Sequence, residues 1–379
     1  MFATAIGGTG PPVCAVEFRN GARRVFGAGP SAFSLVFTGE AQFEWFTKAD
    51  AYSLALAFIR GEFGVRGDLV SAIRFLRTGY RPGWRGHFFA ALARYAPSRW
   101  FQTRSGAARN IRFHYDRSND FYRQFLDSRL QYSEARYEEP SWSLEQAQLA
   151  KLDHLCRKLD LRRGERYLDI GCGWGGLALH AAEHYGVRAT GCTLSRRQHE
   201  YAVAEAAARG VSVEFHETDY RDLDGRFEKV SSIGMYEHVG RRRLRGYFTK
   251  VARLMDDRGL FLNSGIVRPQ SVEDGPETLF LQRHVFPGGE LPHLADVIRD
   301  AEQAGFEVLD VENVRLDYAR TCRDWVARLD ENAEACLRHV DAETYRTWQL
   351  YLAASALSFE EGQTDVCHVL LRKLRGALG

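Results

Sequence analysis

The chain has 379 residues, of which 45% are hydrophobic and 26% are charged. This composition is typical of a folded globular protein and excludes a disordered chain, a collagen and a small disulfide scaffold. At roughly 150 residues per domain, the length predicts two or three domains. No apolar run is long enough for a transmembrane helix, and we see no secretory signal at the N-terminus. The cysteines include no CxxC pair, which argues against zinc or a disulfide framework and indicates a reducing cytoplasm.

Positive charge is concentrated at the N-terminal end. Residues 1–113 contain fifteen Arg and Lys against six Asp and Glu, although the whole chain carries only +2. Aromatic residues alternate with these arginines, as in Trp84-Arg85 and Arg99-Trp100. Arginines beside rings suit an anionic membrane surface, and they also suit single-stranded nucleic acid. A basic lobe that packs on an acidic domain would produce the same asymmetry.

The first hundred residues predict a small α+β lobe. Asn20-Gly21 between two β-rich runs is a strong hairpin signal. Two amphipathic helices follow, then a Gly- and Arg-rich stretch that is typical of a boundary, then a short helix ended by Pro97. The predicted elements are strands at 13–20 and 22–27 and helices at 49–61, 68–77 and 88–96. We assign residues 1–100 to this lobe.

The remainder of the chain, residues 101–379, predicts an α/β domain. A helix begins after Ser143, which we expect to form a capping box with Gln146. Strands and helices then alternate, which indicates a doubly wound, Rossmann-like sheet. The predicted strands are 166–172, 188–194, 211–219, 229–239, 259–267 and 306–314, and the predicted helices between them are 175–186, 195–210, 244–255 and 294–305.

A glycine-rich turn follows the first of these strands. Gly171 and Gly173 allow the backbone to turn tightly and approach a ligand, and Asp169 precedes them directly. A dinucleotide-binding fold would carry an acid after its second strand, but that strand ends in 191–195 without one. NAD is therefore disfavoured. The LDIGCGWG turn instead resembles that of S-adenosylmethionine-dependent methyltransferases.

Several further strings accompany this turn. They are HYDRSNDFY at 114–122, LQYS at 130–133, TLSRRQ at 193–198, MYEHVG at 235–240, VFPGGELP at 285–292 and YART at 318–321. Together they resemble the cyclopropane fatty acid synthase family, which includes the mycolic acid methyltransferases, over about residues 110–372. The resemblance implies methyl transfer from S-adenosylmethionine to the cis double bond of an acyl chain in phospholipid. A carbocation forms, and a bound bicarbonate removes a proton to close a cyclopropane ring.

The resemblance also implies the cofactor-binding residues. Without it, Thr193, Ser195 and Gln198 would be interpreted as a helix cap and a surface residue. The implied contacts are Tyr132, Ser133, Asp169, Gly171, Gly173, Gly175, Thr193, Ser195 and Gln198, with Asp219 and Tyr220 at the adenine pocket. We expect no metal.

The catalytic positions depart from the family pattern. Glu237 and Tyr318 match, but Glu134 replaces a bicarbonate-binding cysteine, and Asn263 stands where we place a family histidine. Bicarbonate is therefore in question as a cofactor. Because a carboxylate resembles bicarbonate in charge and shape, we hypothesise that Glu134 is a built-in base. Close to Glu237 and away from water, one of the two carboxylates should have a raised pKa. The alternative is that Glu134 faces solvent or pairs with Arg136.

The fate of the carbocation stays open at this stage. Tyr236, Tyr318 and Phe286 are candidates to stabilise it through their ring faces. A changed base permits a cyclopropane, a methyl-branched or a methylene-branched product, and some relatives work with a separate flavin-dependent reductase. We expect a peripheral membrane enzyme that acts on phospholipid and not on nucleic acid. The alternatives are a small-molecule methyltransferase on the same fold and a non-catalytic lipid-binding subunit.

Overall fold

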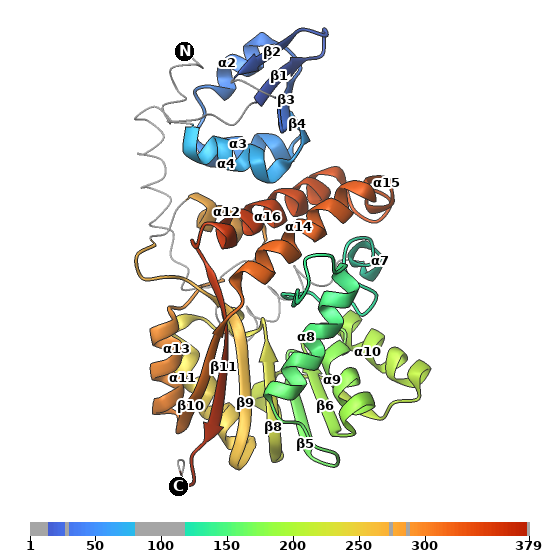
Figure 1. Cartoon of the computed structure of the whole chain (residues 1–379), viewed down its shortest axis with the longest axis vertical. Coiled ribbons are helices and arrows are strands. Elements are labelled where there is room, and N and C mark those ends of the chain that lie inside the picture. The colour runs from blue at the N-terminus through green and yellow to red at the C-terminus, as the bar shows by residue number, and fades with distance from the viewer. Residues whose placement is uncertain (1–13, 27–29, 80–117, 273–275, 286–288, 377–379) are drawn as a thin grey trace.

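The computed structural model describes residues 14–26, 30–79, 118–272, 276–285 and 289–376. Within these residues the strands form two separate sheets (Figure 1). A small N-terminal lobe lies at one end of the molecule and the larger sheet at the other, with a layer of helices between them. The predicted combination of a Rossmann-like sheet and a smaller α+β lobe is confirmed.

The N-terminal lobe has the two predicted hairpin strands and the helices predicted at 49–61 and 68–77. Its sheet order is β2-β1-β3-β4, and β1 and β2 form the antiparallel hairpin that Asn20-Gly21 predicts. Asp50 caps α3 by accepting a hydrogen bond from the backbone of Ser53. The helix predicted at 88–96 and the boundary near residue 100 lie outside the described residues. The bounds are β1 Cys14–Phe18, β2 Arg23–Phe26, β3 Phe33–Phe37, α2 Glu40–Phe46, α3 Ala51–Ile59, β4 Gly64–Gly67 and α4 Leu69–Gly79.

The large sheet has the order β10-β11-β9-β8-β5-β6-β7 in the described chain. Strands β5 to β9 run parallel, and β10 and β11 are antiparallel to their neighbours. Strand order reverses between β5 and β8, and open α/β sheets bind ligands at such a switch point. The strands are β5 Arg166–Ile170, β6 Arg188–Thr193, β7 Val213–Glu217, β8 Phe227–Ile233, β9 Met255–Val267, β10 Phe306–Asn313 and β11 Asp365–Lys373.

Helices cover both faces of this sheet (Figure 1). Helices α8, α9 and α10 lie on one side, and α11 and α13 lie on the other. Ser143 and Gln146 form the predicted capping box at the start of α8. These helices are α7 Asn119–Tyr122, α8 Leu144–Lys158, α9 Gly176–His180, η2 Ala181–Tyr185, α10 Arg196–Arg209, η3 Tyr220–Asp222, η4 Tyr236–His238, η5 Arg241–Arg243, α11 Leu244–Arg253, α12 Pro276–His284 and α13 Leu294–Gln303.

The last helices join the lobe to the sheet. They are α14 Arg315–Glu331, α15 Ala333–Cys336 and α16 Ala342–Glu360, and α16 packs against both α3 and α4 of the lobe. Glu360 pairs with Arg74 of the lobe and with Arg323 of α14. One buried apolar cluster includes residues of the lobe and of α14 and α16, among them Trp325 and Trp348. No helix in the described residues is long and apolar enough to cross a membrane.

Candidate active site

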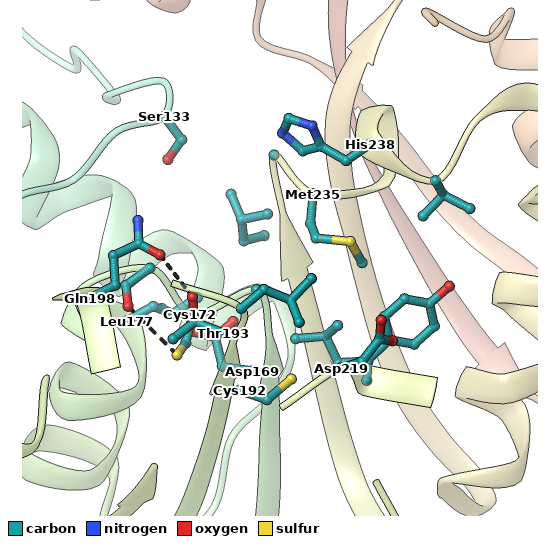
Figure 2. A pocket seen from close by; sticks show the side chains of 18 of the residues that line it. Ser133, Asp169, Cys172, Leu177, Cys192, Thr193, Gln198, Asp219, Met235 and His238 are labelled. Atoms are coloured by element: carbon teal, nitrogen blue, oxygen red, sulfur yellow. Dashed lines mark hydrogen bonds between the residues drawn. The ribbon is translucent and has the colours of Figure 1, made fainter. Parts of the chain in front are cut away.

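A cavity of about 530 Å³ opens at the carboxyl ends of the central strands. It lies at the switch point between β5 and β8, where the fold predicts a ligand. Figure 2 shows Asp169, Thr193 and Asp219 on one side and Met235 and His238 on another. Of the residues that the resemblance implies for the cofactor, those that line the cavity are Tyr132, Ser133, Asp169, Gly171, Gly173, Thr193, Gln198, Asp219 and Tyr220.

The glycine-rich turn exposes its backbone to the cavity. Gly171, Gly173 and Gly175 have φ values of 76°, 55° and 85°, which residues other than glycine rarely adopt. A Cβ atom on Gly173 would meet nothing closer than the Gln198 amide at 4.0 Å, so this backbone borders open space. Gly175 is not a lining residue. It caps α9, and its role is to allow close packing against Phe215.

Polar side chains around the cavity are held by one another. Thr193 Oγ1 donates to Gln198 Oε1 at 2.8 Å (Figure 2). Ser195 does not line the cavity: it is fully buried and caps α10 by accepting from the backbone N–H of Gln198. Its contribution is therefore to fix Gln198. Asp219 accepts hydrogen bonds from the guanidinium group and the backbone N–H of Arg221.

Lys151 is a buried cation that sequence reasoning missed. Its Nζ atom donates to Gln131 Oε1 at 2.8 Å and to Ser133 Oγ at 3.1 Å. Burial raises the pKa of nearby Asp169 to about 6. A hydrogen bond from Ser231 and the charge of Lys151 oppose this rise in the pKa. Desolvation lowers the pKa of Lys151, while the neighbouring carboxylates, Glu134 first, raise it. A lysine in an amphipathic helix gives no sequence signal of burial.

Glu134 lies behind the cavity wall, next in the chain to the lining residue Ser133. Its Oε1 atom is 2.7 Å from His368 Nε2 and 3.4 Å from Ser264 Oγ. The Glu134 and His368 side chains are only 4% and 2% exposed, so this hydrogen-bonded pair is shielded from water. Burial alone would raise the pKa of Glu134, but the hydrogen bond and charge of His368 and the charge of Lys151 lower it below its ordinary value.

Glu237 and Tyr318 join Glu134 in this buried group, which we call the acid cluster: Glu134, Glu237, Ser264, Tyr318 and His368. Glu237 Oε1 accepts from the backbone N–H of Ile266 at 2.7 Å. Burial, with the charge of Glu134 as a further cause, raises the pKa of Glu237 to about 7. Burial also raises the pKa of Tyr318 well above its usual value, and Glu134 and Glu237 add to this shift. The Tyr318 phenol therefore stays protonated at neutral pH.

Of the expectations for the acid cluster, one is confirmed and one is wrong. One carboxylate does have a raised pKa, but it is Glu237, because His368 compensates the charge of Glu134. A pairing of Glu134 with Arg136 is wrong, since Arg136 pairs with Glu138 and Glu312. Tyr236 is fully buried, and Phe286 lies outside the described residues.

The correspondence of Asn263 with a family histidine stays a prediction, but Asn263 is not the residue of β9 that contacts Glu134. Asn263 Oδ1 accepts from Tyr247 at 2.9 Å, whereas Ser264 faces Glu134. Successive residues of a strand point to opposite faces, which is why Asn263 and Ser264 have different partners. His368 was not predicted, because its strand carries no local motif. Its one sequence signal is that a histidine interrupts an apolar run, residues 366–371.

The acid cluster and the cavity are adjacent but distinct. Glu134, Glu237 and Tyr318 do not line the cavity. Ser133, next to Glu134 in the chain, and His238, next to Glu237, do line it. The residues present fit S-adenosylmethionine. Asp169 and Asp219 suit its positive charge and hydroxyl groups, and the bare Gly173 backbone suits close approach. Fold and cavity together define an S-adenosylmethionine-dependent methyltransferase.

Comparisons with known proteins narrow this class. The family model for mycolic acid cyclopropane synthetase matches residues 102–369. A probable fatty acid methyltransferase of Pseudomonas putida is 38% identical, with 92% of this chain and 89% of that protein covered. Cyclopropane mycolic acid synthase 3 of Mycobacterium tuberculosis is 34% identical, with coverages of 70% and 96%.

A solved structure agrees. Mycolic acid cyclopropane synthase CmaA1, crystallised with SAH and CTAB, is 32% identical over 70% of this chain and 98% of its own, with a TM-score of 0.67. The chain therefore belongs to the mycolic acid cyclopropane synthetase family. It is an S-adenosylmethionine-dependent methyltransferase of the cyclopropane synthase and fatty acid methyltransferase type.

Proposed function

We propose that this chain methylates the cis double bond of an unsaturated fatty acyl chain in phospholipid, and that Glu134 is the base. The observation that carries the proposal is the buried contact of 2.7 Å between Glu134 and His368 beside the cofactor cavity. The relationship to a probable fatty acid methyltransferase supports the acyl substrate. Asp169, Gly171, Gly173, Thr193, Gln198 and Asp219 would hold S-adenosylmethionine, which supplies an electrophilic methyl group when bound.

The acid cluster is suited to the proton loss that must follow. The π electrons of the double bond form the new bond to the methyl carbon, whose bond to the sulfonium sulfur breaks so that S-adenosylhomocysteine leaves. The other carbon of the double bond becomes a carbocation. A C–H bond then breaks, its electron pair neutralises the cation, and the proton goes to the Glu134 carboxylate. Glu134 is suited to this role because His368 keeps it ionised without water. Glu237, with a pKa of about 7, is the poorer candidate because much of it is already protonated at neutral pH.

Glu134 would then occupy the place of bicarbonate. Its carboxylate has two buried partners, Ser264 and His368, in addition to its proximity to Glu237 and Tyr318. A bicarbonate ion beside Glu134 would add a second full negative charge to a dry site that also holds the partly ionised Glu237, which is electrostatically costly. We therefore propose that turnover does not need bicarbonate. We also propose that the Tyr318 ring stabilises the cation through an aromatic face. The ring centroid lies 4.6 Å from that of Phe359, against which it stacks. Because the phenol stays protonated, it does not act as a nucleophile.

The membrane contact is proposed for the basic N-terminal region. Its described arginines include exposed side chains such as Arg23, Arg24 and Arg66, each of which also pairs with an acid. Arginine-rich aromatic segments suit an anionic lipid surface. We propose a cytoplasmic enzyme that binds the membrane peripherally. A methyl- or methylene-branched olefin would be saturated by a separate flavin-dependent reductase.

One experiment tests the activity and the product. The chain is expressed in a host that has unsaturated phospholipids but no synthase of its own, with methionine that carries a fully deuterated methyl group. A ring that retains two deuteriums means cyclopropanation, whereas an olefin with three or two deuteriums means a methyl or methylene branch. Absence of labelled lipid in a host that makes folded protein would overturn the lipid substrate and favour a small molecule.

A second experiment tests the base. Purified enzyme is assayed on vesicles of unsaturated anionic phospholipid in buffer depleted of carbon dioxide, with and without added bicarbonate. We expect equal rates. Strong stimulation by bicarbonate would show that Glu134 does not replace it.

A further inference from the structure

Three residues form a row across the large sheet, which we call the cross-strand row: Glu312, His368 and Ser264. Glu312 of β10 lies directly opposite His368 of β11, and His368 lies directly opposite Ser264 of β9. Opposed residues on adjacent strands place their side chains on the same face. His368 therefore has a sheet neighbour on each side, and Glu134 approaches it from the segment before α8.

The His368 ring lies between two carboxylates. Its Nε2 atom is 2.7 Å from Glu134 Oε1, and its Nδ1 atom is 3.8 Å from Glu312 Oε2. Nδ1 has no hydrogen-bond partner within the described residues. A ring with an anion at each nitrogen is stabilised most when both nitrogens carry protons. A neutral ring would leave one lone pair aimed at a carboxylate.

Glu312 is a fixed negative charge at the outer end of the row. Its carboxylate accepts from Arg136 at 2.8 Å, from Lys158 at 2.7 Å and from His154 at 2.8 Å. These hydrogen bonds, that of His154 first, hold the pKa of Glu312 far below its ordinary value. Its side chain is 26% exposed, so it connects a dry ion pair to the surface. The charged groups around the row are Glu134, Arg136, Lys151, His154, Lys158 and Asp317.

A metal site is the competing interpretation of the same residues. Ligand atoms of His154, Glu312 and His368 lie within 4.8 Å of one another. However, Arg136 and Lys158 already bind the Glu312 oxygens, and two adjacent cations repel a divalent ion. The arrangement therefore favours a protonated imidazole over a metal.

We infer that His368 is a positioning residue that keeps Glu134 ionised and aimed, and that Glu312 holds His368 in its doubly protonated form. The inference rests on the proposed role of Glu134 as the base. It predicts that Glu312, a partly exposed residue on edge strand β10, controls the charge of the buried Glu134 through His368.

The first test reads the ring directly and needs no activity. The full chain is labelled with ¹⁵N-histidine, and the His368 signals are assigned by their loss in His368→Asn. We expect both nitrogens to have imidazolium shifts at pH 7.5, and Glu312→Gln to convert them to those of a neutral ring. A neutral His368 in the unmodified protein would overturn the inference, even if lipid methylation is confirmed. Stoichiometric Zn²⁺ that shifts the same signals would also overturn it in favour of a metal site.

The second test reads the pH profile. Glu307→Gln is the matched control, because Glu307 is on the same strand but pairs with exposed Arg372. We expect Glu312→Gln to move the acidic limb of kcat to higher pH, because a neutral His368 no longer lowers the pKa of Glu134, with KM unchanged. His368→Asn should lower kcat about tenfold, less than the ~100-fold that loss of the base itself would cause, with SAH affinity retained. Identical profiles for Glu312→Gln and Glu307→Gln would contradict the inference, since a merely structural role shifts no limb.

Discussion

The cofactor cavity and the acid cluster are adjacent, but they are built in different ways. Much of the cavity comes from short contiguous strings, such as 169–173 and the start of α10. Each member of the acid cluster comes from a different part of the chain: the segment before α8, η4, β9, α14 and β11. The cavity is therefore mainly a local property of the chain. The acid cluster exists only once the sheet and α14 have assembled.

The two regions also treat buried carboxylates differently. Burial raises the pKa of Asp169 in the cavity to about 6, since a hydrogen bond from Ser231 and the charge of Lys151 compensate it only in part. Burial has the same effect on Glu237, but His368 reverses it for Glu134. Of these three buried carboxylates, only Glu134, which contacts His368 directly, has a pKa below its ordinary value. Within the acid cluster, this difference separates the proposed base, Glu134, from the partly protonated Glu237.

The largest expected effect comes from removal of the base. Glu134→Gln keeps the shape of the side chain but removes its charge, and leaves His368 without its anion. We expect the rate of lipid methylation to fall by about 100-fold or more, as loss of a general base usually does. SAH affinity, measured by calorimetry, should change little, because Glu134 does not line the cavity.

The control for this variant is Glu139→Gln, an exposed glutamate five residues along the same segment. It should leave both rate and affinity unchanged. Full turnover by Glu134→Gln would remove Glu134 from the mechanism. Equal loss of turnover and of SAH binding would mean that cluster and cavity are one functional unit.

The second effect is on stability and depends on pH. Glu237 has a pKa raised from 4.5 to about 7, so folding favours its protonated form and its contribution to stability falls as pH rises through this window. The penalty at pH 8 approaches ~3 kcal/mol at about 1.4 kcal/mol per pKa unit. Glu237→Gln should therefore stabilise the protein at pH 8 and be nearly neutral at pH 4.5.

Glu134 has the opposite sign. Its lowered pKa means that its carboxylate contributes stability above its ordinary pKa and loses it as pH falls. Glu134→Gln should therefore destabilise the protein more at pH 8 than at pH 4.5. Urea unfolding of both variants at the two pH values checks the pair. Parallel pH dependences would mean that the two carboxylates share one environment.

This contrast explains what the sequence could predict. The alternation of strands and helices, the turn at Gly171 and the Ser143 cap are encoded within a few residues each, and all were predicted. Glu134 and Glu237 were found through a resemblance. His368 and Lys151 could not be found, because their partners are fixed by strand pairing and by burial. The same limit applies to Ser264, which lies opposite His368 and faces Glu134 only because β9 and β11 pair in this register.

The third effect tests the local construction of the turn. Gly175 and Gly164 have nearly equal φ values, 85° and 86°, but different surroundings. A Cβ atom on Gly175 would lie 2.7 Å from the Phe215 ring, whereas one on Gly164 would meet nothing within 4 Å. Gly164→Ala should cost ~1–2 kcal/mol of strain alone. Gly175→Ala should cost about 1–3 kcal/mol more, from overpacking, and weaken SAH binding. Equal costs in thermal unfolding would mean that the Phe215 contact relaxes freely.

The smallest effect separates the two regions with single hydroxyl groups. Ser231 Oγ donates to Asp169 at 2.7 Å in the cavity, and Ser264 Oγ lies 3.4 Å from Glu134 in the acid cluster. A hydrogen bond to a charged group contributes about 1.5–3 kcal/mol, and the longer contact should contribute less. At the lower end of this range, Ser231→Ala should weaken SAH binding roughly tenfold and change kcat less. Ser264→Ala should lower kcat a few-fold, ~1 kcal/mol, and leave SAH binding unchanged. If each variant altered both quantities in proportion, the cavity would not be separable from the cluster, and the base would have to be sought among the residues that bind the cofactor.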